Sequence, residues 1–173
     1  MNNFNLLISC PRYNEVNATA EIWFTLFISG DKYPVISNLD FSGLISAATS
    51  VNNREIIAKI KDILRNDPKF FKFILKIIPI DYVCETNLTL IKELITKHYS
   101  EYIDQKDSIR IDLKRRKSKI IERESFIKVI ADIFTNKVNL STPDKIIHCE
   151  ILGNMTGISF LTPNYVISIN PPS

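Results

Sequence analysis

The chain has 173 residues, 45% hydrophobic and 24% charged, so it is long and apolar enough to fold around one or two cores. Its formal net charge of +3 excludes a uniformly basic protein. Three cysteines, Cys10, Cys84 and Cys149, form no C-x-x-C pair, which argues against a disulfide framework and a cysteine zinc site. Because no basic leader precedes an apolar run, we expect a cytoplasmic protein without a membrane segment.

The first segments follow strand and helix patterns in turn. Residues 5–10 predict a strand, and the stretch from Asn14 to Gly30 predicts a helix with Asn14 as its N-cap. Five apolar side chains recur there at helical spacing and are expected to form the buried face: Val16, Ala20, Trp23, Phe24 and Phe27.

The next segments complete a known motif. Residues 34–41 and 43–50 read as two strands joined by a turn at Ser42-Gly43. A second helix follows Asn52-Asn53, and residues 72–80 read as a strand. The order β-α-β-β-α-β predicts a ferredoxin-like unit.

The second half is expected to be an α/β unit. A helix capped near Thr86 or Asn87 precedes the alternating strand 108–113, and a fourth helix starts within residues 119–124. Three strand-like pieces follow, at residues 145–152, 157–161 and 165–169. The fold class is therefore α+β, with domains at residues 1–85 and 86–173 packed on one another.

Motifs for catalysis or metal binding are weak. The four glycines form no phosphate-cradling loop, and His148 and Cys149, as strand neighbours, point to opposite faces. His98 and Cys10 read as structural residues, and NPPS at 170–173 as the end of a terminal strand. We expect no catalytic residue, no metal site and no small-molecule cofactor.

The positive charge is concentrated in one segment. From Arg110 to Lys128 there are eight basic and three acidic residues, a net +5, whereas the rest of the chain carries −2. The segment joins a strand to a helix start, where backbone N–H groups attract anions, and its arginines can bind phosphate oxygens bidentately. With about five phosphate contacts, log affinity for single-stranded RNA would fall with log salt at a slope of roughly −3.5.

The order of motifs resembles the THUMP domain of RNA-modifying proteins. SIRIDLKRR precedes an amphipathic helix, an L-x-x-P-D turn, an E-I-x-G strand and a G-I-S strand. The matching residues are Val138, Leu140, Pro143, Asp144, Glu150, Ile151, Gly153, Gly157, Ile158 and Ser159. The segments 5–26, 42–46 and 74–86 further resemble stand-alone THUMP proteins that act as adaptors for tRNA cytidine acetylation.

This resemblance implies a non-catalytic protein that grips the acceptor stem and 3′ end of tRNA for a separate RNA acetyltransferase, which forms N4-acetylcytidine. Carried over by position, the phosphate contacts are Lys114, Arg115, Arg116, Lys117 and Lys119, with Arg123 and Lys145 as weaker candidates. Arg110 opens the same basic segment, and Arg12 would extend the surface from the other domain. In place of the family's usual small capping residue, this chain has IIERES before the fourth helix.

Two alternatives remain at this stage. The chain would also suit the RNA-binding subunit of another tRNA modification enzyme, for thiolation or methylation. A basic protein-interaction module with no RNA role is the other.

Overall fold

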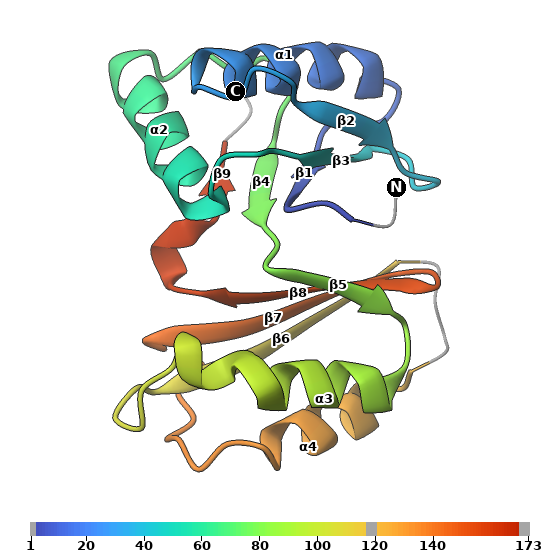
Figure 1. Ribbon diagram of the computed structural model, residues 1–173, viewed down its shortest axis with the longest axis vertical. Coiled ribbons are helices and arrows are strands. Elements are labelled where there is room, and N and C mark those ends of the chain that lie inside the picture. Colours follow the sequence, from blue (N-terminus) through green and yellow to red (C-terminus); the bar gives the residue numbers. More distant parts are fainter. Residues whose placement is uncertain (1–2, 117–120, 170–173) are drawn as a thin grey trace. The chain divides into compact units, whose positions relative to one another are not determined.

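A computed structural model describes residues 3–116 and 121–169. The chain divides into two compact units (Figure 1). The first comprises residues 3–80 together with the segment from Tyr165, and the second comprises residues 81–164. These units differ from the expected domains at two places, because residues 81–85 join the second unit and the last strand joins the first. Compact units defined by contacts are not a test of domain boundaries, so the boundary at residue 85 stays a prediction.

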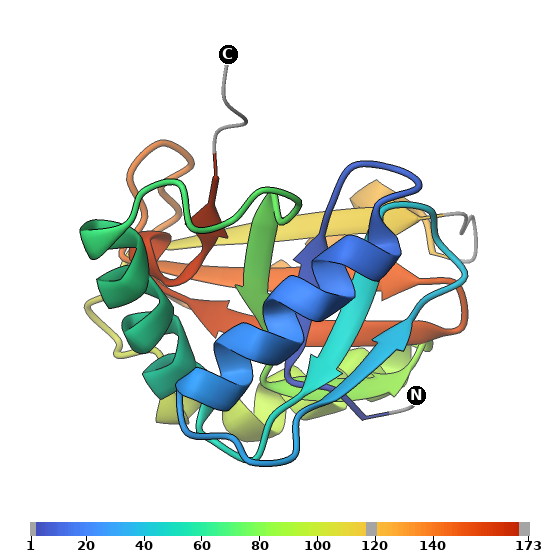
Figure 2. The same ribbon diagram turned by 90° about the horizontal axis from the view of Figure 1, so that it is seen from above.

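The first unit has the predicted βαββαβ order. Its elements are β1 (Leu6–Ser9), α1 (Glu15–Ile28), β2 (Val35–Asn38), β3 (Leu44–Ala48), α2 (Asn53–Asn66) and β4 (Lys76–Pro79), followed late in the chain by β9 (Ile167–Ser168). The sheet order is β2-β3-β1-β4-β9, and the described strands pair in antiparallel fashion throughout. Both helices cover one face of this sheet (Figures 1 and 2). The ferredoxin-like arrangement is therefore present.

The buried face of α1 was predicted wrongly. The helix buries Ala18, Ile22, Thr25 and Leu26, whereas the predicted Trp23, Phe24 and Phe27 are each 44–49% exposed. Both stripes have helical spacing, so periodicity alone does not choose between them. The polar Thr25 is suited to burial because its hydroxyl donates to the carbonyl of Glu21. Large apolar side chains of α1 are consequently left on the surface.

The helix starts are close to the predicted positions, but their caps differ. Asn52 and Asn87 accept hydrogen bonds from backbone N–H groups of α2 and of α3 (Leu88–His98). Asn14 occupies the N-cap of α1, yet its side chain makes no capping hydrogen bond. Its amide contacts Arg12 and Asn17 instead.

The second unit is a mixed sheet covered by two helices. Its strands are β5 (Tyr82–Glu85), β6 (Ile109–Arg116), β7 (Lys145–Leu152) and β8 (Met155–Leu161), in the order β5-β8-β7-β6. β6 lies parallel to β7, and the other pairs are antiparallel. Figure 1 shows α3 and α4 (Arg123–Ala131) on the same face of this sheet. The sequence patterns predicted every one of these elements except β5.

The core of this unit lies between the sheet and the two helices. Ile91 and Ile95 of α3 and Phe126 and Ile130 of α4 pack in one buried cluster with strand side chains, Cys149 among them. His148 instead hydrogen-bonds Glu150, two residues along the same strand, so it lies on the face opposite to Cys149, as strand alternation predicts. Among the described residues no helix is long and apolar enough to cross a membrane.

Candidate nucleic-acid interface

Three basic residues close strand β6 at the edge of the second sheet. Lys114, Arg115 and Arg116 are its last residues, and all three are exposed. The eight-residue parallel pairing with β7 holds their backbone, since Lys114 lies opposite Glu150 and Arg116 opposite Leu152. The predicted residues Lys117 and Lys119 follow directly, but they lie outside the described part of the chain.

Several element ends gather around these residues. The turn after β7 contains Asn154, whose carbonyl accepts a 2.8 Å hydrogen bond from the N–H of Thr86, just before α3. Helix α4 begins at Arg123, and its N-cap Glu122 makes no side-chain capping bond. The Glu122 carboxylate accepts instead from the hydroxyl of Ser125, at 2.9 Å. The basic end of β6 therefore lies beside the start of α4 and at the same end of the sheet as the start of α3, where helix dipoles favour anions.

Two of the arginines join β6 to the start of α4. Arg115 Nη1 donates to the carbonyl of Ile121 at 2.9 Å, and Arg123 Nη1 donates to the carbonyl of Leu113 at 2.9 Å. Each of these bonds uses one of the five N–H groups of a guanidinium, which leaves further N–H groups that can donate to an anion. These arginines thus have a structural role that their charge alone does not reveal.

Arg116 pairs with a buried carboxylate. Its Nε lies 3.1 Å from Oε1 of Glu150, and Nε2 of His148 lies 3.1 Å from Oε2. Burial favours a raised pKa for Glu150, but the hydrogen bonds and charges of His148 and Arg116 outweigh it and hold the pKa below its usual value. Glu150 is therefore ionised at neutral pH and neutralises part of the basic cluster. Sequence reasoning missed this pairing, although strand alternation places residues 148 and 150 on one face.

Lys114 differs from its neighbours because its side chain has no partner within residues 3–116 and 121–169. Among the described residues, no ion pair or side-chain hydrogen bond involves it. A lysine ammonium in water is free to meet a phosphate without first breaking an internal bond. Among the described basic residues at this end of β6, Lys114 is therefore the one whose ammonium group can bind a phosphate without losing an internal contact.

Of the two weaker candidates, Arg123 lies at the cluster, whereas Lys145 lies elsewhere, as do Arg110 and Arg12. Arg110 forms a 3.0 Å ion pair with Asp112 and donates to the carbonyl of Leu140. Lys145 lies 4.0 Å from Asp107. Lys145 pairs in register with Ile109, seven residues before Arg116, which is about 23 Å along a strand. Arg12 is exposed and belongs to the other compact unit, in the turn between β1 and α1.

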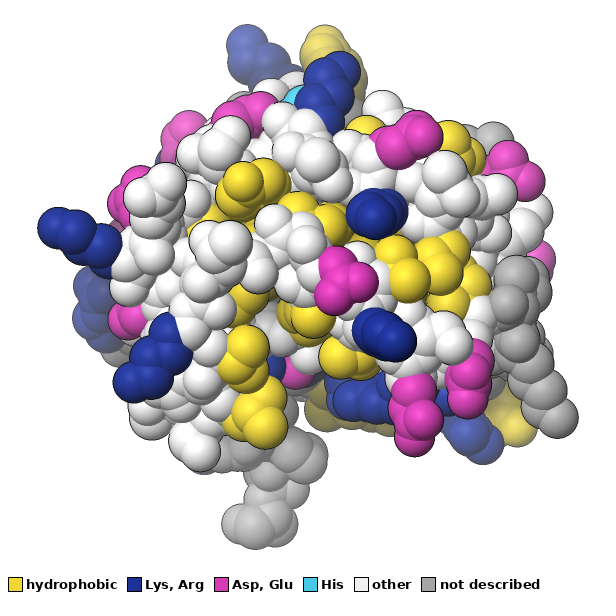
Figure 3. Space-filling model, turned by 90° about the horizontal axis from the view of Figure 1, so that it is seen from below, with side chains coloured by type: hydrophobic (Ala, Val, Ile, Leu, Met, Phe, Trp, Pro, Cys, Tyr) yellow, Lys and Arg dark blue, Asp and Glu magenta, His cyan; other side chains and the backbone are white. Residues whose placement is uncertain are grey.

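The face formed by α3 and α4 carries no single field of charge. Figure 3 shows basic, acidic and apolar side chains interspersed across it. The basic cluster is thus a feature of one end of the sheet and of the helix starts beside it.

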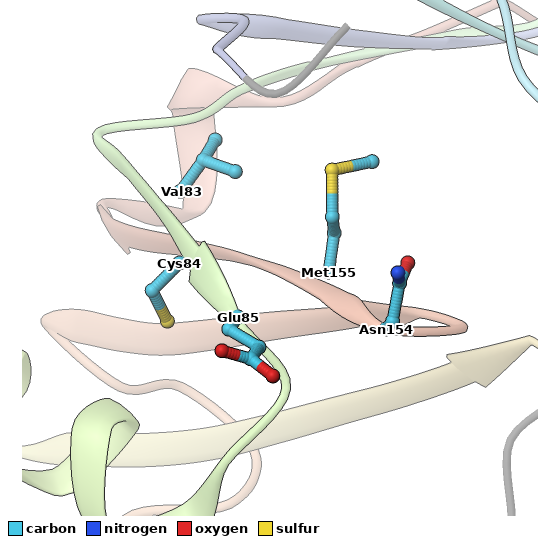
Figure 4. Close-up of a pocket in the computed structure, with 5 residues that line it drawn as sticks. All are labelled: Val83, Cys84, Glu85, Asn154 and Met155. Atoms are coloured by element: carbon cyan, nitrogen blue, oxygen red, sulfur yellow. The ribbon is translucent and has the colours of Figure 1, made fainter.

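A pocket in the second unit lies next to the start of α3. It is lined by Val83, Cys84, Glu85, Asn154 and Met155. In Figure 4 the Val83 and Met155 side chains point to one side of the sheet and Cys84 to the other. Burial raises the pKa of the Cys84 thiol to about 11, which keeps it protonated at neutral pH. No cluster of metal-binding side chains occurs among the described residues.

The geometry defines an α+β protein in which a ferredoxin-like unit accompanies a four-stranded α/β unit with a basic sheet end. A sequence model of the THUMP domain matches residues 85–161. The chain therefore contains a THUMP domain, as its motifs predicted.

Solved structures share this fold over nearly the whole chain. PH1313 from Pyrococcus horikoshii matches 95% of this chain and 55% of its own, with 18% identity and a TM-score of 0.66. TrmN from Thermus thermophilus matches 91% and 45%, with 6% identity and a TM-score of 0.58. A 4-thiouridine synthetase, solved with RNA and ATP, matches 96% and 42%, with 10% identity and a TM-score of 0.56.

The chain spans about half the length of these structures. No curated protein sequence matches it. These likenesses extend to the THUMP domain and the fold, and not to acetylation adaptors in particular.

Proposed function

We propose that this chain is a tRNA-binding adaptor that holds the acceptor stem and 3′ end and presents the tRNA to an RNA cytidine acetyltransferase for N4-acetylcytidine formation. The observation that carries the proposal is the cluster of Lys114, Arg115 and Arg116 at one end of the THUMP sheet, beside the start of α4. The choice of tRNA as ligand and of acetylation as reaction rests on the motif resemblance. The 4-thiouridine synthetase solved with RNA is a precedent for RNA binding by a protein of similar fold.

The cluster suits a phosphate backbone because it combines charge with a fixed position. Arg115 and Arg116 are tethered to Ile121 and Glu150, so their guanidinium planes lose less freedom when they bind. Lys114 adds a charge that forms no ion pair with a described residue. Backbone contacts of this kind position a nucleic acid without reading its sequence. An adaptor of this design selects its target nucleotide by distance from the grip.

The non-catalytic role is supported by the state of the cysteines. Burial raises the pKa of the Cys10 and Cys84 thiols, and that of the fully buried Cys149 thiol most of all. Thiols in this state are poor nucleophiles. The proposal accordingly needs a separate enzyme and no small-molecule cofactor.

Binding to tRNA with and without its 3′ CCA tests the grip. We expect the full-length tRNA to bind at least about tenfold more tightly at matched salt, because removal of the CCA end would remove phosphates that the proposed grip contacts. Equal affinity for both tRNAs would contradict the grip on the 3′ end. Absence of tRNA binding even at low salt would contradict an RNA role and favour the protein-interaction alternative.

Reconstitution tests the partner. We expect an RNA cytidine acetyltransferase to form N4-acetylcytidine in tRNA with this chain and to lose most of that product without it, as measured by mass spectrometry of digested tRNA. A stimulated thiolation or methylation, with acetylation unchanged, would support the alternative of a subunit for another modification enzyme.

A further inference from the structure

The first unit exposes apolar side chains that the basic cluster does not explain. They lie on one face of α1 and on the segment around β2, which together we call the α1–β2 surface. Its members and exposed fractions are Val16 (77%), Trp23 (44%), Phe24 (49%), Phe27 (48%), Tyr33 (86%) and Val35 (52%).

The surface contains a groove. Val16, Thr19, Ala20 and Trp23 of α1 form one wall, and Pro34, Val35 and Ile36 form the other. Figure 2 shows α1 running beside the outer strand β2. None of the residues that line the groove is charged, so an RNA backbone has nothing to bind there.

Strand β2 leaves one edge of the sheet open. It stands at the end of the order β2-β3-β1-β4-β9, so among the described strands only β3 pairs with it. Lysine, other charged residues and proline usually protect an edge strand. The sequence of β2, VISN, contains none of them. The open backbone and the apolar groove therefore lie side by side.

We propose that two copies of this chain associate through the α1–β2 surface. A two-fold axis beside β2 pairs it with the β2 of the second copy in antiparallel fashion, which continues the all-antiparallel sheet. The same axis brings the exposed face of α1 against its copy. The uncharged groove meets its own copy without like-charge repulsion, so it is self-complementary in a way that the basic cluster is not.

The exposed apolar area supplies a large part of what such an interface needs. Three aromatic side chains, each presenting about 150–250 Å² and each about half exposed, leave on the order of 300 Å² of apolar surface. Val16, Tyr33 and Val35 extend it toward the roughly 800 Å² per partner of a stable interface. Trp23 and Phe27 are also stacked, with centroids 5.4 Å apart and planes at 6°, so part of the surface is already ordered.

Mass measurement of the full chain tests the association. By light scattering after gel filtration, we expect twice the monomer mass at high concentration and dissociation on dilution. Trp23 is the single tryptophan of the chain, so its fluorescence should shift to shorter wavelength as the dimer forms. A monomer up to about 1 mM, where even weak complexes form, would overturn the proposal.

Substitutions locate the interface. We expect Trp23→Glu with Phe27→Glu to give a monomer with an unchanged far-ultraviolet circular dichroism spectrum, because both side chains lie outside the core. Leu140→Glu is the matched control, since Leu140 is 70% exposed and lies in the second unit, and it should remain dimeric. Val35→Lys tests the edge strand and should weaken the dimer at least about tenfold. A dimer that persists in the Trp23 and Phe27 double variant would overturn the proposal, as would a monomer in which another protein occupies this surface.

Discussion

The Nε atom of Arg116 lies 3.1 Å from Oε1 of Glu150, a side chain with only 2% of its surface exposed. One member of the basic cluster is thereby fixed by the sheet that carries it. The pair joins the last residue of β6 to the middle of β7, in addition to the parallel backbone pairing. Arg116 has two roles to separate, one in stability and one in the proposed RNA grip.

Removal of Arg116 should destabilise the fold. Arg116→Ala leaves the Glu150 carboxylate buried with His148 as its remaining partner, and we expect a loss of about 1–3 kcal/mol in the free energy of unfolding. This loss of unfolding free energy is smaller than for a fully buried ion pair, because the Arg116 side chain is 43% exposed. Urea unfolding measures it. Lys114→Ala is the control and should change stability by less than about 0.5 kcal/mol; equal stability of the two variants would contradict the structural role.

Lys114 should contribute to RNA binding without contributing to stability. Lys114→Ala removes an unpaired charge, so we expect weaker tRNA binding and a plot of log affinity against log salt that is shallower by about 0.7–0.9. Filter binding at several salt concentrations measures the slope. Lys106→Ala serves as the matched variant, because Lys106 is an exposed lysine just before β6, at the opposite end of that strand. If both variants lower the affinity and the slope equally, the charge effect is general and the cluster is not the grip.

Stability should fall in acid, in part through Glu150. Its pKa in the folded protein lies below the ordinary 4.5, so the unfolded chain takes up a proton first as the pH falls. The stabilisation is complete above about pH 5 and is lost as the pH falls through the folded-state pKa. Asp31, whose pKa is also lowered by hydrogen bonds that outweigh its burial, adds to the same trend.

Glu150→Gln isolates the contribution of Glu150 to this trend. The variant keeps an oxygen for Arg116 but does not titrate, so we expect its unfolding free energy to fall less steeply between pH 5 and pH 3 than that of the natural chain, over about the range where carboxylates titrate. Urea unfolding at a series of pH values gives the comparison. Parallel pH profiles would rule out a lowered pKa for Glu150.

Gly43 should tolerate no side chain. Its φ of +76° lies in the left-handed region, and an added Cβ would come within 2.7 Å of the carbonyl oxygen of Cys10. That carbonyl belongs to backbone, and the N–H of Cys10 also donates to the carbonyl of Gly43, so the neighbours cannot move apart cheaply. We expect Gly43→Ala to lower the melting temperature and to cost more than about 1–2 kcal/mol. The exposed neighbour Ser42→Ala should leave stability nearly unchanged, and a similar result for both would contradict the steric argument.

Much of the fold was predictable because periodicity and turn residues agree along most of the chain. The alternation of residues 108–113 predicted β6, and Asn52 and Gly43 marked a helix start and a turn that the structure confirms. Strand β5 was missed because it is four residues long and follows β4 after only two residues. The face of α1 was misassigned because both of its sides are apolar, so hydrophobicity there does not indicate the core.

The basic cluster was predictable only as charge. Local sequence showed where the positive residues lie, but not that Arg115, Arg116 and Arg123 each hold an internal partner. Each partner lies 6 to 34 residues away from its arginine in the sequence. The pairing of β6 with β7 and the path of the chain into α4 bring them together. Similarly, Asp144 of the L-x-x-P-D turn accepts bonds from the N–H and hydroxyl of Ser108, a contact that only the fold reveals.

Strand β6 is the outer strand of its sheet, yet parts of its open side are occupied. At its beginning Ile109 exchanges backbone bonds with Lys137 and Asn139, and farther along the Leu113 carbonyl is taken by Arg123. A foreign extended peptide would have to displace these bonds before it could add to β6. Arg123 thus also covers part of an open strand edge. We expect its loss to make edge-to-edge association of chains through β6 more frequent.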